Sequence, residues 1–121
     1  MSADRNTLDL RAELLTVRPR GLDKLWCFRR EIRVPTAEIS SVRVAPKSAI
    51  PRGLRTLGTD LGVKICGTFQ SRGASNFWNY RGPGPVLVIE LAPTQPFRHL
   101  YLSVAAPERV AEMLSARLGL H

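Results

Sequence analysis

Residues 58–80, GTDLGVKICGTFQSRGASNFWNY, decide the fold class of this chain. Apolar and polar positions alternate over residues 61–66, which is the period of a strand with one buried face. The small polar group at residues 70–74 predicts a turn, and Phe77 and Trp78 belong to a second, aromatic strand. The stretch therefore predicts a β-hairpin.

Two Gly-Thr pairs, Gly58-Thr59 and Gly67-Thr68, bracket the first strand of this hairpin. Glycine at a strand end permits a bulge or a close backbone crossing, so we expect both pairs at corners of a small barrel. Residues 58–64 resemble a phosphate loop only superficially. The glycines are too close together, no Ser or Thr follows Lys64, and the flanks predict strands.

On both sides of the hairpin the chain alternates in the same way. Turns are expected at residues 35–38 and 81–85. Residues 86–91 are almost continuously apolar, as in a strand buried on both faces. The further strands are expected at residues 7–17, 31–34, 39–46 and 100–104.

The C-terminal residues predict the clearest helix. Pro107 suits the first helical position, Glu108 complements the helix dipole and Gly119 suits the end of the helix. One apolar face is expected, made of Val110, Met113, Leu114 and Leu118. Residues 22–30 are compatible with a buried strand or a short helix, and we predict the helix.

Residues 46–58 carry prolines, glycines and cations without a clear period, so they predict a long basic loop. Loops of that length are often functional.

Length and composition predict a single domain over residues 1–121, with a core from about residue 8 to residue 118. No apolar run approaches the roughly 20 residues that span a bilayer. The N-terminus carries acids and lacks the apolar centre of a signal peptide. We therefore expect a cytoplasmic protein.

The 18 Lys and Arg residues exceed the ten acids and give a formal net charge of +8. Such a surplus favours anionic partners such as nucleic acid, acidic protein or anionic lipid headgroups. General solubility explains the same surplus equally well, so charge alone selects no partner.

The sequence offers little material for catalysis or metal binding. Cys27 and Cys66 are far apart in apolar contexts, which predicts buried thiols rather than a disulfide framework or a metal knuckle. His99 and the terminal His121 are the only histidines. A Cys66–His99 dyad is the one nucleophilic pair that stays open, although a thiol in an apolar strand is a poor nucleophile. We predict no enzyme, no metal site and no cofactor.

These elements add up to a mainly β chain of the α+β type. About seven antiparallel strands would form a partly open barrel, with a short extra helix after the first strand. An amphipathic C-terminal helix would cover the open side.

The order of elements and several short phrases resemble bacterial pleckstrin-homology-like (PH-like) proteins, in particular small uncharacterised members common in actinobacteria. The resemblance covers roughly residues 8–118. The phrases that carry it are RVP at 33–35, EISSV at 38–42, the two Gly-Thr pairs, Phe77-Trp78 and VLVIEL at 86–91. It implies two near-orthogonal antiparallel sheets and a C-terminal helix that plugs one end.

In relatives that bind phosphoinositides, basic residues near the end of the first strand and on the second surround the headgroup. Arg18, Arg20 and Arg33 match that pattern in part. Glu31 beside Arg33 and the inserted residues 22–30 depart from it, so the resemblance does not imply inositol phosphate recognition.

Anion binding is the functional hypothesis that the charge supports best. If the PH-like topology holds, six cations would lie at one open end and form a rim for an anionic membrane surface. These are Arg18, Arg20, Lys24, Lys47, Arg52 and Arg55. The protein would then be a non-catalytic binding or scaffold module, in peripheral contact with the inner face of the membrane.

Alternatively, the module would bind a protein partner or associate with itself. Trp78 and Tyr80, or an edge at residues 97–101, would provide the contact surface. A basic β-barrel that binds nucleic acid by stacking bases on Phe77, Trp78 and Tyr80 ranks behind it. An enzyme ranks last.

Overall fold

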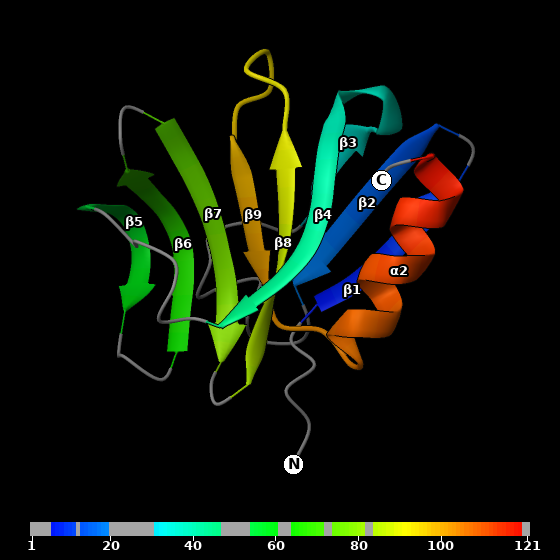
Figure 1. The fold of residues 1–121 in the computed structure, drawn as a ribbon. Helices are drawn as coiled ribbons and strands as arrows, with labels where there is room; N and C mark the ends of the chain where they lie inside the picture. The colour runs from blue at the N-terminus through cyan, green and yellow to red at the C-terminus, as the bar shows by residue number, and fades with distance from the viewer. Residues whose placement is uncertain are drawn as a thin grey trace.

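The computed structural model describes residues 6–11, 13–19, 31–46, 54–60, 64–71, 74–81 and 84–119. Within these ranges the protein is mainly β, with two sheets and one C-terminal α-helix (Figure 1). The predicted helix at residues 22–30 lies outside the described residues.

A three-stranded antiparallel sheet contains β1 (Asn6–Arg11), β2 (Leu14–Pro19) and β3 (Ile32–Pro35), in that order. The single first strand predicted at residues 7–17 is therefore wrong, because the chain folds back between Arg11 and Leu14. A two-residue turn reverses the parity of the inward positions. Leu15 and Val17 are buried, whereas Leu14 is 38% exposed.

The short 3-10 helix η1 (Thr36–Glu38) follows β3 and leads into the second sheet, at the place where the sequence predicts a turn. The backbone N–H of Thr36 donates to the carbonyl of Glu13, 2.9 Å away. This bond ties η1 to the turn between β1 and β2.

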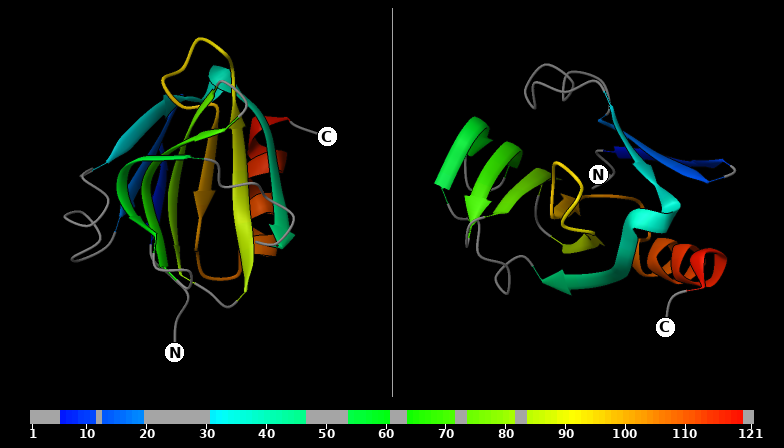
Figure 2. Two further views of the ribbon diagram at one scale, coloured as in Figure 1. Left: turned by 90° about the vertical axis from the view of Figure 1, so that its left-hand side faces the viewer. Right: turned by 90° about the horizontal axis from the view of Figure 1, so that it is seen from above.

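The second sheet has six strands in the order β4-β8-β9-β7-β6-β5, and it curves strongly (Figure 2). Its strands are β4 (Ile39–Pro46), β5 (Leu54–Asp60), β6 (Lys64–Ser71), β7 (Ala74–Arg81), β8 (Pro85–Leu91) and β9 (His99–Leu102).

The predicted hairpin is confirmed as β6 and β7, paired from Lys64 and Arg81 to Ser71 and Ala74. Gly58 and Gly67 lie opposite each other, but the register irregularity of this region falls between Arg55 and Leu57. Gly67 has a φ of 123°, a conformation that favours glycine. The two Gly-Thr pairs are thus strand positions, and the irregularity lies one to three residues before Gly58 rather than at it.

Residues 54–58, predicted as part of a basic loop, form the start of β5. They lack apolar alternation because this strand is at the edge of its sheet, where backbone pairing to β6 sets the structure.

The nine strands of the described residues exceed the predicted seven, and not all of them are antiparallel. β9 pairs with β7 in parallel and with β8 antiparallel. It is inserted between two strands that are consecutive in the chain. The two described sheets do not close into a barrel.

The helix α2 (Pro107–Leu118) confirms the predicted C-terminal helix. Pro107 is in the first turn and Gly119 caps the C-terminus with a φ of 69°. The helix packs against β4 and β8, with Ala111 and Leu114 buried. Met113, expected on the apolar face, is 47% exposed.

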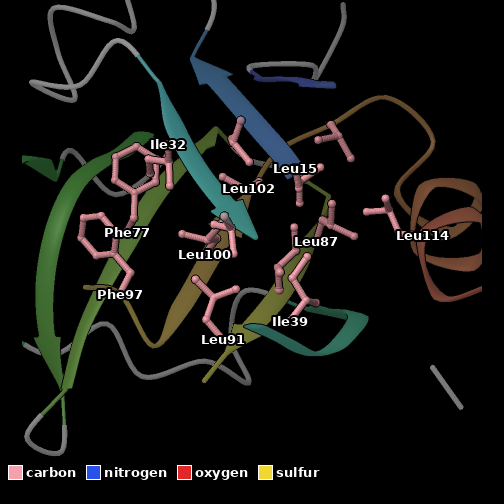
Figure 3. Close-up of a cluster of buried hydrophobic side chains, with 14 of the residues drawn as sticks. Leu15, Ile32, Ile39, Phe77, Leu87, Leu91, Phe97, Leu100, Leu102 and Leu114 are labelled. Carbon is pink, nitrogen blue, oxygen red and sulfur yellow. The ribbon is translucent and has the colours of Figure 1, made fainter. Parts of the chain in front are cut away.

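The main core lies between the two sheets. Leu15 and Ile32 of the small sheet point toward Leu100 and Leu102 of the large sheet, and Leu114 of α2 closes one side (Figure 3). A second cluster occupies the opposite face of the six-stranded sheet: Ala45, Phe69, Trp78, Tyr80, Val86, Val88 and Tyr101. Because β8 contributes to both, residues 86–89 are completely buried, as predicted.

Candidate functional site

Arg18, the first of the six predicted anion-binding residues, is engaged in ion pairs. Its guanidinium lies 3.5 Å from Asp9 and 3.4 Å from Glu31. Arg11 pairs with Asp9, and Arg33 pairs with Glu31. These charges form an alternating ladder across the outer face of the three-stranded sheet, so the positive charge of Arg18 is largely balanced within the protein.

Four of the other five predicted cations lie outside the described residues: Arg20, Lys24, Lys47 and Arg52. The fifth, Arg55, is opposite Phe69 in the β5–β6 register. Residues 20–30 connect two neighbouring strands of the small sheet. Residues 47–53 connect β4 to β5, the two outermost strands of the large sheet. The proposal of a shared basic rim therefore stays a prediction.

The net positive charge is distributed unevenly along the chain. The described ranges hold ten of the 18 cations and eight of the ten acids, a net charge of +2. The remaining residues hold eight cations and two acids, a net charge of +6. Five of these six charges belong to residues 20–30 and 47–53. The framework of strands and helix is thus nearly neutral, and the connections are strongly basic.

Trp78 and Tyr80, predicted as an exposed interaction surface, are buried, and that prediction is wrong. Their exposed fractions are 0% and 2%. Trp78 packs on Tyr101 with ring centroids 4.4 Å apart and meets Phe69 edge-on at 6.4 Å. Gly67, directly opposite Trp78, contributes no side chain of its own, so the aromatic cluster gathers on this face.

The hydroxyl of Tyr80 donates to the carbonyl of Gly84 at 2.6 Å, and burial raises the pKa of this phenol. Phe77 is also 0% exposed. These three rings cannot stack on nucleic-acid bases. The edge expected at residues 97–101 is absent from the described sheet, because β9 lies between β7 and β8.

A row of polar side chains that the sequence did not predict crosses the large sheet. The register aligns Asn76, His99, Glu90 and Ser41 on four neighbouring strands. His99 Nδ1 lies 3.0 Å from Asn76 Oδ1, and the Ser41 hydroxyl donates to Glu90 Oε1 at 3.3 Å. His99 also stacks on Tyr101 at 5.4 Å. In the sequence, only the alternation of apolar and polar residues over 99–102 indicated which face of the strand carries His99.

Burial lowers the pKa of His99, and Arg98 and Arg43 lower it further, while Glu90 acts in the opposite direction. The imidazole is therefore neutral near pH 7. The Ser41 hydroxyl is bonded to Glu90 rather than to His99, so the row does not form a nucleophile and base pair.

The strand registers also argue against a Cys66–His99 dyad. Cys66 lies opposite Asn79 on β7, whereas His99 lies opposite Asn76, three positions away. Strand spacings separate the two α-carbons by about 14 Å, which is too far for a hydrogen-bonded pair.

The lowered pKa of His99 predicts a pH dependence of stability. The folded state favours the neutral ring, so this stabilisation is complete above the unfolded pKa of about 6.5 and is lost as the pH falls below it. The urea midpoint of the wild type should therefore decrease as the pH is lowered through this range. In His99→Gln the midpoint should decrease less. Parallel pH profiles for the two proteins would contradict the assignment.

Hollows also lie at the surface of the described part of the chain. One of about 410 Å³ lies between the β1–β2 turn, η1 and the end of α2, and one of about 400 Å³ adjoins Pro46 and Pro85. A third, of about 350 Å³, is lined by residues at the start of β7 and in the β8–β9 connection.

In the described part of the chain, no helix is both long and apolar enough to cross a membrane. The same residues hold no cluster of three or more His, Cys, Asp or Glu side chains that suits a metal ion. Comparison with protein-family models, with curated proteins and with solved structures finds no match for this chain.

Proposed function

We propose that this protein is a non-catalytic binding module of the PH-like type, which contacts an anionic partner through its basic connections. The observation that carries the proposal is the separation of charge. The strand and helix framework is nearly neutral, while residues 20–30 and 47–53 contribute five net positive charges in 18 residues.

The framework supports this role in two ways. Its own cations are largely matched by acids, as in the ladder of Asp9, Arg18 and Glu31, so they compete little for an external anion. Two packed sheets with a C-terminal helix also provide a framework that carries these connections, and binding residues are commonly found in loops on such a scaffold. The PH-like assignment rests on this combination and on the sequence resemblance, and the parallel β7–β9 pair departs from an all-antiparallel barrel.

The partner in this proposal is an anionic surface, either the inner face of the membrane or an acidic protein. Each Lys or Arg near an anionic bilayer contributes about 1 kcal/mol. Contacts of this kind are weakened by salt, since exposed charges are screened over a Debye length of about 8 Å at physiological ionic strength.

The test compares two triple variants with the same loss of charge. Lys24→Gln, Lys47→Gln and Arg52→Gln remove cations from the connections. Arg43→Gln, Arg109→Gln and Arg117→Gln remove exposed cations from the framework. Sedimentation with vesicles containing phosphatidylserine should show roughly 100-fold weaker partition for the first variant and a much smaller loss for the second.

Vesicles of phosphatidylcholine alone provide the control for charge. If the wild type fails to sediment with anionic vesicles at low salt, the membrane form of the proposal is wrong. Pull-down from a native lysate then tests the protein form, with the first triple variant as the matched control. Equal binding by both triple variants in the two assays would contradict the proposal as a whole.

A further inference from the structure

The hollow of about 410 Å³ at the C-terminal end of α2 lies between parts of the chain that are distant in sequence. One wall is the β1–β2 turn together with η1, and the other is the last turn of α2 (Figure 1). Leu10 and Leu118 line it and are half-buried against the main core. The charged residues among its described lining are Glu13 and Arg117, so the two walls carry opposite charges.

Both charged groups are available to a partner. Glu13 and Arg117 are exposed, and neither has an ion-pair partner among the described residues. The backbone on each side is held in place. The carbonyl of Glu13 accepts from the N–H of Thr36 at 2.9 Å, and Gly119 caps the last turn of α2. Groups on an ordered backbone lose less freedom when a partner docks.

The two large hydrophobic side chains that are exposed in the described part of the chain adjoin these same charges. Leu14, 38% exposed, follows Glu13 and lies opposite Pro35 of the hollow in the β2–β3 register. Met113, 47% exposed, precedes Arg117 by four residues and therefore shares its face of α2. Each wall thus presents an exposed apolar side chain beside an unpaired charge, negative on one wall and positive on the other.

We propose that this surface binds a second copy of the chain across a two-fold axis. In such a contact the same patch of both copies meets itself, and each pair of contacts occurs twice. Glu13 pairs with Arg117 of the partner subunit, and Leu14 packs on Met113 of the partner subunit. A patch with one charge of each sign is complementary to itself. An acidic or a basic partner would instead place a like charge against one of the two groups.

The first test is the mass of the full chain in solution. Each copy carries a formal net charge of +8, which opposes association, and exposed ion pairs contribute little. We therefore expect a dissociation constant of about 10 to 100 µM at about 0.15 M salt. In analytical ultracentrifugation the mass should rise from monomer toward dimer between about 1 µM and about 1 mM protein. A monomer at every concentration overturns the proposal and leaves the hollow to a different protein.

Charge reversal then tests the surface. Glu13→Arg alone and Arg117→Glu alone should each weaken the dimer by about tenfold or more, because like charges then face each other across the axis. An equimolar mixture of the two variants should associate, since every reversed charge meets one of opposite sign. This recovery also shows that both variants are folded. Glu112→Arg, an exposed position on a different face of α2, is the matched control and should associate nearly as the wild type does.

If the wild type dimerises but the mixture stays monomeric, the two-fold contact at this hollow is wrong. Equal weakening by Glu112→Arg and Glu13→Arg would also overturn it, since association would then follow net charge. The triple variant of Lys24, Lys47 and Arg52 should dimerise at least as strongly as the wild type. Vesicle sedimentation at about 1 µM protein measures a mostly monomeric chain. The dimer and the anionic surface contact proposed above can therefore fail separately.

Discussion

Trp78→Ala should lower the free energy of unfolding by about 3 to 5 kcal/mol, the range for a large aromatic side chain removed from a core. Trp78 is completely buried on the face of the large sheet opposite the main core, where it contacts Tyr101, Tyr80 and Phe69. Losing the indole would leave a cavity at the centre of that cluster. Urea unfolding followed by circular dichroism measures the change.

Two further variants test whether the loss comes from the buried aromatic ring. Trp78→Phe keeps an aromatic ring and removes the indole N–H, which is buried without a hydrogen-bond partner, so it should cost clearly less than Trp78→Ala. Met113→Ala, at a residue 47% exposed, should cost under about 1 kcal/mol. If Trp78→Ala lowers the free energy of unfolding by less than about 1 kcal/mol, the second core is contradicted and Trp78 is exposed.

Asn6→Ala should destabilise the protein by about 3 kcal/mol, because it removes a buried polar link between the two sheets. Asn6 Nδ2 donates to the carbonyls of Asn79 and Ser103, at 3.0 and 2.9 Å. Asn79 Nδ2 donates back to Asn6 Oδ1 at 2.9 Å. All three residues are buried, so water cannot replace Asn6 without a rearrangement.

The same bonds secure the chain at the end of β9. The N–H of Ser103 donates to the carbonyl of Asn79 at 3.0 Å, and that carbonyl also accepts from Asn6. Thr94→Ala is the matched control, because it removes an exposed hydrogen bond to Glu38 and should cost under about 0.5 kcal/mol. Equal losses from Asn6→Ala and Thr94→Ala would show that the link between the sheets contributes little.

The hollow at the start of β7 illustrates a limit of sequence reading. Ser75, Gln95 and Arg98 are ordinary surface residue types in the sequence, and no spacing marks them as neighbours in the fold. They meet because the β8–β9 connection returns to the start of β7, where Arg98 bonds to Ser75. The predicted basic cations, in contrast, were selected by their charge and by their place in the expected PH-like topology. Arg18 proves to be paired with Asp9 on β1 and with Glu31, directly before β3.

The sequence by itself determined the elements that depend on neighbouring residues. These are the C-terminal helix with its Pro107 start and Gly119 end, the β6–β7 hairpin, and the buried strand at residues 86–91. Helix caps, turns and continuous apolar runs act over a few residues, so their signals are present in the local sequence.

Only the tertiary structure decided which strands pair. The insertion of β9 between β8 and β7 places Tyr101 against Trp78 and converts an expected contact surface into a second core. The pairing of β5 with β6 makes a strand from residues without apolar alternation. Such pairings are fixed by backbone hydrogen bonds and side-chain packing between distant segments, and periodicity within one segment carries no information about its partner.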